Sequence, residues 1–174
     1  MDVKRMQLVL RAVAVLVLVL TACLVGLDSQ TKLVFGILEK KATFRDLDAL
    51  FVLVHVVSVA AGYNLVQLGQ EIATRNRSEG RSSSSSFYLY LNWVCFFFDQ
   101  VAVYLVFAAN CAALEASMLA VTGAERLQWM KLCDTFTRFC FQMGGGLVCG
   151  FIACFVMAAI SSYVSFKVNL SKLT

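Results

Sequence analysis

Four long runs of apolar residues, separated by short polar segments, constrain this chain more than any other feature. They cover about residues 8–27, 47–70, 88–120 and 139–166. Each reaches the roughly 20 residues that a helix needs to cross a hydrocarbon layer of about 30 Å. The sequence therefore predicts one domain over residues 1–174, an all-α membrane protein. We expect an antiparallel up-down bundle of four transmembrane helices joined by short loops.

Composition supports a lipid environment. The chain is 60% hydrophobic and only 15% charged, whereas a soluble domain is roughly 45–50% apolar and about a quarter charged. The first run follows Lys4 and Arg5, as the core of a signal peptide does. Such cores usually hold about 7–15 residues and this run holds about 20, so we expect an uncleaved helix.

The sequence offers no sign of catalysis. It has no nucleophile paired with a base and no Cys/His spacing suited to zinc, so we predict no enzyme activity, no cofactor and no metal. The net charge of +4 comes from basic residues beside the apolar runs, which is typical of anchors at anionic lipid headgroups. Membrane lipid is thus an expected partner and nucleic acid is not. His55 is interpreted as a buried, hydrogen-bonded imidazole.

Two charges within the apolar runs carry the main structural prediction. Arg11 lies in the first run and Asp99 in the third. Arg11 has a stem long enough to snorkel to the headgroups, but a carboxylate has not. A charge at mid-bilayer costs at least about 2.5–3.5 kcal/mol, so Asp99 is expected to face the bundle interior and find a partner. We predict a structural ion pair between Arg11 and Asp99.

Glu115 is a further acidic residue of the third run. It is interpreted as an interfacial residue with a hydrated carboxylate or as a polar packing contact. An alternative hypothesis is a small channel or transporter that uses Asp99 and Glu115, in which His55 would join a proton relay. No repeated spacing supports that alternative.

Small residues mark the faces on which these helices can pack closely. Ala109 and Ala113 belong to such a face of the third run, and Gly146 and Gly150 to one of the fourth. In lipid, small residues let backbones approach and so promote helix association. These faces can serve the bundle itself or contacts between copies of the chain.

Topology is not decided by counting basic residues, because seven flank the side of the two termini and seven the other side, with Arg11 left out. Lys4 and Arg5 beside the first helix favour cytosolic termini. A Ser-rich loop over residues 71–87 is then cytosolic too. Sequons at Asn76 and Asn169 fall on the same side and are expected to carry no glycan.

Two cysteines, Cys133 and Cys140, flank the start of the fourth run. With cytosolic termini they face outward, where disulfides persist. On one straight helix they would lie about 10 Å apart, so a bond requires a turn between them. We favour a disulfide, and the alternative is a pair of free thiols.

Several segments together resemble the Casparian strip membrane domain-like (CASP-like) family, a plant group related to MARVEL proteins. They are Leu10-Arg11, Asp46-Leu47-Asp48-Ala49-Leu50, Phe97-Phe98-Asp99-Gln100 with Tyr104, and the stretch from Cys133 to Cys140. Further segments are similar to the second subgroup of the family, namely Ala112-Ala113-Leu114-Glu115 and Phe139-Cys140-Phe141-Gln142. The resemblance covers nearly the whole chain.

The resemblance implies a multi-pass protein of the plasma membrane with cytosolic termini, in which Arg11 and Asp99 are family hallmarks. The founding members form a scaffold that recruits wall-modifying enzymes such as peroxidases. Their first outer loop is distinctive and residues 29–37 here differ from it, so a role in the Casparian strip itself is not implied. We predict a scaffold that self-assembles, alone or with related family members, organises a membrane subdomain and recruits extracellular cell-wall enzymes.

Overall fold

A computed structural model describes residues 3–27, 29–34, 38–43, 48–77, 85–122 and 137–173 of the chain. The helices are α1 (Val3–Gly26), α2 (Asp48–Arg77), α3 (Ser85–Thr122) and α5 (Thr137–Leu173). All four are long and apolar enough to cross a membrane, through segments at 5–26, 48–73, 93–119 and 140–165. The predicted bundle of four transmembrane helices is confirmed.

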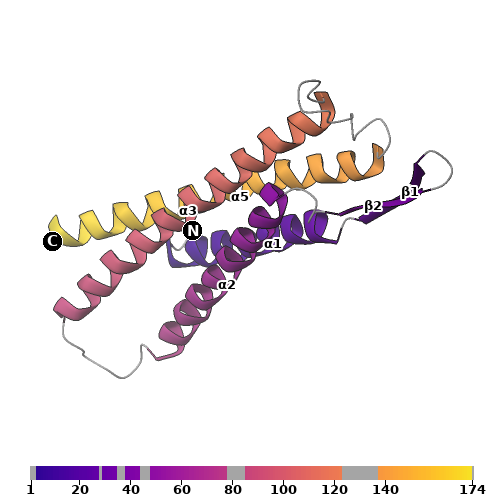
Figure 1. The fold of residues 1–174 in the computed structure, drawn as a ribbon. Helices are drawn as coiled ribbons and strands as arrows, with labels where there is room; N and C mark the ends of the chain where they lie inside the picture. The colour runs from indigo at the N-terminus through magenta and orange to yellow at the C-terminus, as the bar shows by residue number, and fades with distance from the viewer. Residues whose placement is uncertain are drawn as a thin grey trace.

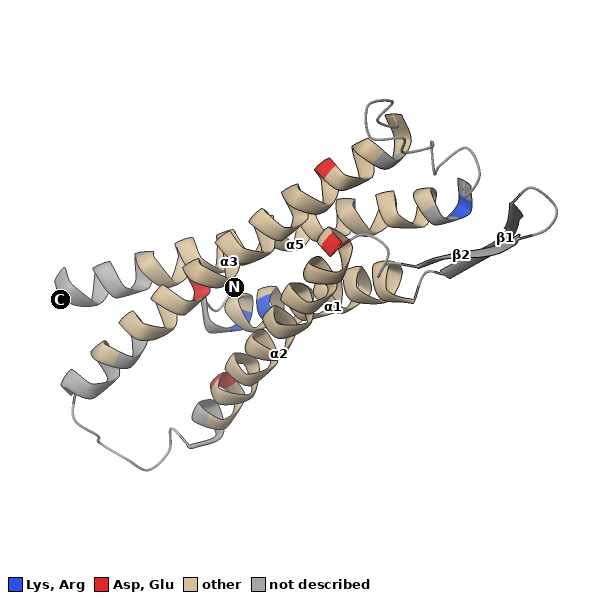
Figure 2. Cartoon of the chain, in the orientation of Figure 1, with Lys and Arg blue, Asp and Glu red and all other residues tan. Residues whose placement is uncertain are grey.

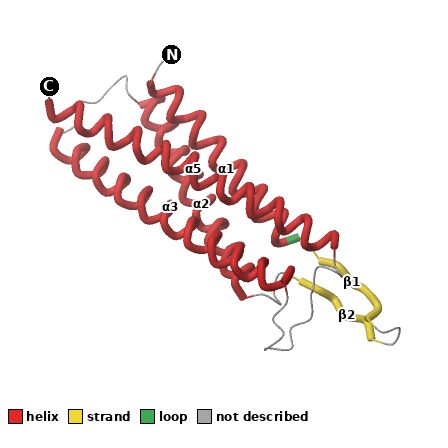
Figure 3. Tube along the Cα trace, turned by 90° about the horizontal axis from the view of Figure 1, so that it is seen from above, coloured by secondary structure: helices red, strands yellow, loops and turns green. Residues whose placement is uncertain are grey.

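The helices run side by side in alternating directions, and both chain termini lie at the same end of the bundle (Figures 1 and 3). Close packing joins α1 to α2, α2 to α3, α3 to α5 and α5 back to α1. This order closes a ring, so α1 and α3 lie diagonally opposite each other. A side chain that joins these two helices must therefore cross the centre of the bundle.

The connection between α1 and α2 differs from the predicted loop. It contains β1 (Ser29–Val34) and β2 (Leu38–Thr43), which pair as an antiparallel hairpin with Ser29 opposite Thr43 and Val34 opposite Leu38. The hairpin projects past the helices at the end away from the termini (Figure 1). Pairing satisfies backbone groups that a loop would leave to water.

The predicted Ser-rich loop over 71–87 is shorter in the structure. α2 continues through Arg77 and α3 begins at Ser85, and residues 78–84 lie outside the described part. Helices need not stop where the apolar run stops, because Gln, Glu, Ala and Arg favour helix once the chain has left the hydrocarbon.

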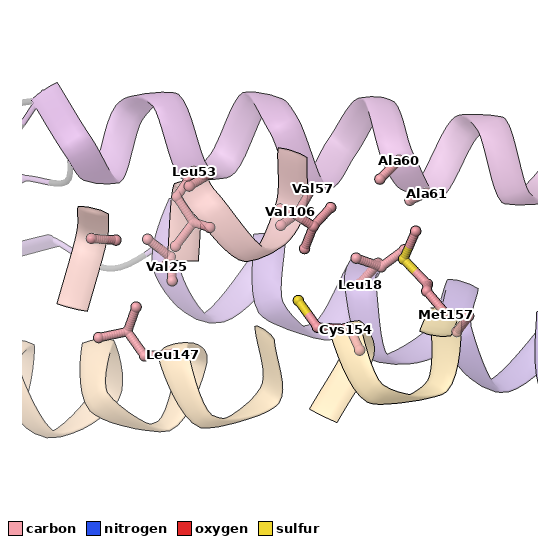
Figure 4. Close-up of a cluster of buried hydrophobic side chains, with 14 of the residues drawn as sticks. Leu18, Val25, Leu53, Val57, Ala60, Ala61, Val106, Leu147, Cys154 and Met157 are labelled. Atoms are coloured by element: carbon pink, nitrogen blue, oxygen red, sulfur yellow. The ribbon is translucent and has the colours of Figure 1, made fainter. Parts of the chain in front are cut away.

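The interior of the bundle is filled by small and medium apolar side chains from all four helices (Figure 4). Leu18 of α1, Leu53 of α2, Val106 of α3 and Leu147 of α5 are all buried. Charged residues are sparse along the described helices (Figure 2). Because lipid tails are as apolar as these side chains, the bundle depends on close packing and on polar contacts between helices.

Candidate functional site: an ion pair across the bundle

The guanidinium of Arg11 binds the carboxylate of Asp99 through two contacts. Nη2 lies 2.9 Å from Oδ2 and Nη1 lies 3.3 Å from Oδ1. The two side chains are only 2% and 5% exposed. Arg11 comes from α1 and Asp99 from α3, so this two-pronged contact spans the diagonal of the ring of helices. Arg11 therefore does not snorkel, and the structure brings the two predicted partners together.

Helix α2 supplies two further partners of the same guanidinium. The Nε group of Arg11 donates to Oε1 of Glu71 over 3.1 Å, and its Nη1 lies 3.5 Å from Oδ1 of Asn64. Asn64 donates its own Nδ2 hydrogen to the carbonyl of Ala60 over 2.9 Å, which turns Oδ1 toward Arg11. Gln7 donates to the same Oε1 of Glu71. We call Arg11, Asp99, Asn64 and Glu71 the Arg11 cluster.

Helical spacing explains why these side chains meet. Gln7 and Arg11 are four residues apart and share a face of α1, while Asn64 and Glu71 are seven apart and share a face of α2. Sequence analysis missed both α2 partners, because it placed Glu71 in a loop and did not weigh Asn64. A polar amide within an apolar run, seven residues from an acid, is the signal that identifies them.

The cluster sets one cation against two carboxylates. Burial of an ion pair costs several kcal/mol per ion, and this cost is offset only when geometry is good and the remaining donors are bonded. Arg11 meets that condition with partners on both α2 and α3. Such an arrangement holds three helices together, and it leaves the carboxylate of Asp99 engaged with a cation.

Two more polar contacts join α3 to α5 along the bundle. Ser161 donates to Oε1 of Gln100 over 3.0 Å, and Asn110 donates from Nδ2 to the carbonyl of Leu147 over 3.1 Å. Oδ1 of Asn110 is buried and has no hydrogen-bond partner among the described groups. Gly150 points a Cα–H bond at this oxygen, since a Cβ built there would meet it, and such contacts recur where helices pack closely.

The small residues expected at packing faces lie inside this bundle. Ala109 and Ala113 of α3 are buried. A Cβ added to Gly146 would lie 2.6 Å from Cγ2 of Val25, so Gly146 lets α5 approach α1, and Gly150 lets α5 approach α3 at Asn110. These four positions therefore serve contacts within the chain.

Other candidate residues stand apart from the cluster. Glu115 is exposed on α3, roughly 24 Å along the helix from Asp99 at 1.5 Å per residue. His55 donates from Nδ1 to the carbonyl of Phe51 over 2.8 Å, but its side chain is exposed and not buried as predicted. A histidine in a helix can bond to a backbone carbonyl of the preceding turn while its ring faces outward, and the sequence alone does not reveal this arrangement.

Cys133 lies outside the described residues, so its disulfide with Cys140 stays a prediction.

Comparison with known proteins identifies the family. The model of the Casparian strip membrane protein domain matches residues 1–156. CASP-like protein 2C1 of Vitis vinifera is 55% identical over 94% of this chain and 78% of its own length, and that of Populus trichocarpa is 51% identical over 99% and 92%. CASP-like protein 2C1 of Arabidopsis thaliana is 42% identical over 96% and 89%. No solved structure matches the chain. The chain therefore belongs to the Casparian strip membrane protein domain family, whose model matches it over residues 1–156.

Proposed function

We propose that this chain is a plasma-membrane scaffold that self-assembles and organises a membrane subdomain, with both termini in the cytosol. The observation that carries the proposal is the internal pairing of the Arg11 cluster. Arg11 holds α1, α2 and α3 in one arrangement, and the polar contacts at Asn110 and Gln100 hold α5 to α3. A bundle locked in this way presents fixed outer faces, as a building block requires.

The outer faces of the helices are suited to lateral contacts. Large apolar side chains stand out from the described helices, including Leu16 on α1, Val59 on α2, Phe97 on α3 and Phe155 on α5. Lipid can solvate all of them, and a neighbouring bundle can replace that lipid wherever the shapes fit better. Assembly within the membrane plane therefore needs no soluble domain.

The β1–β2 hairpin supports a role in recruiting partners. It extends beyond the helices at the end opposite the termini (Figure 1), and with cytosolic termini this end faces the cell wall. The hairpin segment contains Lys32, Lys40 and Lys41. Cell-wall-modifying enzymes with acidic surfaces are the partners that such a segment would recruit.

A channel or transporter remains the alternative function for the two acids. The geometry favours the scaffold, because Asp99 is paired with Arg11 and Glu115 is exposed on α3 far along the helix. Flux of protons or small ions into vesicles that contain the purified protein, lost in Glu115→Gln, a variant expected to keep its fold, would favour transport.

Two measurements test the scaffold directly. In plant cells, a fluorescent fusion is expected to recover slowly after photobleaching, compared with a single-span membrane marker of similar size. In lipid nanodiscs large enough for several bundles, stepwise photobleaching is expected to count more than one copy per disc at low protein-to-lipid ratio. Free diffusion together with single copies would overturn the proposal.

A further inference from the structure

A groove opens between α3 and α5 near the hairpin end of the bundle. It has a volume of about 200 Å³ and is lined by one face of α3 between Leu114 and Val121 and by one face of α5 between Cys140 and Phe151, which includes Gly144. Its walls are almost entirely apolar. Met118 and Val148 on its rim are more than half exposed, so the groove faces the lipid. We call it the α3–α5 groove.

The most exposed large apolar side chain of the described residues lies close to this groove. Phe141 of α5 is 88% exposed. It lies seven residues before Val148, and side chains at this spacing project from one face of a helix. Phe141 does not line the groove, but the preceding residue, Cys140, does, so the protruding ring and one end of the groove lie at the same depth along α5.

Depth matters because a membrane fixes the orientation of every copy. Copies of one chain share the same vertical position in the bilayer, so a protrusion can enter only a hollow at its own level. Phe141 and the α3–α5 groove meet this condition. Because they adjoin on one face of α5, two copies related by a twofold axis along the membrane normal can exchange them, which is a self-complementary contact.

The groove also has the right size and chemistry for a phenyl ring. An apolar protein cavity of about 150 Å³ lined by aliphatic and aromatic side chains binds benzene. Gly144 forms part of the wall, and a Cβ added there would meet nothing within 4 Å in its own chain. Gly144 therefore has no packing role inside the bundle, unlike Gly146 and Gly150. A glycine open to lipid costs helix propensity, and it permits the close approach of another helix.

We propose that two copies of this chain associate through α5, with Phe141 of each copy inserted in the α3–α5 groove of the other. The inference rests on the proposed function, since it names the surface through which the scaffold self-assembles. It commits to a second copy as the occupant. A lipid tail in the groove is the competing outcome, and the experiment below separates the two.

The test uses full-length copies that carry a donor or an acceptor fluorophore at the C-terminus, mixed in lipid vesicles. Phe141→Ala removes the protruding ring, and Gly144→Leu adds a side chain to the groove wall at a position where a Cβ meets nothing within 4 Å. We expect each variant by itself to associate at least about tenfold more weakly than the wild type, as for a central interface residue. Matched controls are Phe97→Ala on α3 and Gly62→Leu on α2, both in exposed positions away from the groove, and they are expected to associate normally.

Mixing the two variants gives the sharpest outcome. A Gly144→Leu copy still has its protruding ring and a Phe141→Ala copy still has its groove, so energy transfer between them is expected to recover in part. Loss without recovery on mixing overturns the exchange of Phe141. Full association of both variants, as a lipid-filled groove predicts, overturns the inference and leaves the scaffold intact. If the wild type itself does not associate, the proposed function fails, and the inference fails with it.

Discussion

Arg11 and Asp99 bind each other across the diagonal of the bundle, between helices that do not pack side by side. Nη2 of Arg11 lies 2.9 Å from Oδ2 of Asp99, and Asn64 and Glu71 of α2 bind the same guanidinium. A pair between neighbouring helices fixes one interface, whereas this pair fixes the width of the whole bundle at its level. The variants below measure how much of the fold depends on it.

Removal of the charge on Asp99 is expected to destabilise the bundle strongly. Asp99→Asn leaves a buried guanidinium with only Glu71 as a charged partner, and breaking a buried pair costs about 3–5 kcal/mol. Thermal unfolding in detergent, followed with a dye that reacts with newly exposed thiols, measures the loss, because Cys154 is buried in the folded chain. The charge reversal Asp99→Arg is expected to prevent surface expression.

The control for this prediction removes both charges. Arg11→Met combined with Asp99→Leu leaves no buried guanidinium, and the carboxylate of Glu71 that loses its cation is 27% exposed, so the double variant is expected to unfold at a higher temperature than Asp99→Asn. A single variant as stable as the wild type would contradict the structural role of the pair.

Glu71 is expected to matter less, and to matter more once Asp99 is neutral. Its side chain is 27% exposed, so water screens the contact, and Glu71→Gln is expected to cost about 1 kcal/mol or less. In the Asp99→Asn background, Glu71 is the remaining carboxylate that the structure places on Arg11, and its loss is expected to cost more. A double-mutant cycle of unfolding free energies reveals this coupling.

Glu115 provides the matched control for Glu71. It is an exposed acid of α3 outside the cluster, so Glu115→Gln is expected to leave stability within about 0.5 kcal/mol of the wild type. A coupling energy of zero between positions 71 and 99 would argue that α2 takes no part in holding Arg11.

The four spans and the Arg11–Asp99 pairing were accessible from sequence for simple reasons. Long apolar runs predict membrane spans directly. A carboxylate on a short side chain, such as that of Asp99, is costly in hydrocarbon unless it pairs with a cation. The hairpin between Ser29 and Thr43 was missed although Gly36 stands between its two strands, because the flanking residues do not alternate clearly between apolar and polar. Glu71 was missed because the hydropathy pattern ends the helix too early, at the edge of the apolar run, whereas Asn64 lies inside the predicted run and was not considered as a partner.

The roles of the glycines show where sequence reasoning stops. Gly144, Gly145 and Gly146 are consecutive, yet only Gly146 faces a neighbouring helix closely, whereas the other two are open. Successive residues point about 100° apart around a helix, so only coordinates assign each one to the inside or the outside. The spacing of Gly146 and Gly150 predicted a packing face without saying which helix it meets.

Asn110 and Gly150 are expected to behave as one unit. Gly150→Ala would place a methyl group 2.9 Å from Cγ of Asn110, and overpacking of this kind costs about 1–3 kcal/mol. Asn110→Ala removes the obstacle, so the double variant is expected to be more stable than the sum of the two single effects predicts. Thermal unfolding of the four proteins in detergent gives the coupling.

Gly144→Ala is the control for that cycle. A methyl group there meets nothing within 4 Å, so the change is expected to be neutral or to stabilise by up to about 1 kcal/mol through helix propensity. Equal losses at positions 144 and 150 would show that the contact with Asn110 is not the cause.

Glycosylation tests the orientation on which the outward role of the hairpin depends. Asn76 and Asn169 lie in the last turns of α2 and α5, at the end of the bundle that carries the termini (Figure 3). With cytosolic termini neither sequon meets the glycosylation machinery, so endoglycosidase treatment is expected to leave the mobility of the wild-type chain unchanged. A flexible segment with one acceptor sequon, inserted between Val34 and Leu38, is expected to gain a glycan that the same treatment removes. The reverse pattern, with glycan at Asn76 or Asn169 and none at the insertion, would show the opposite orientation in the membrane, with the hairpin in the cytosol.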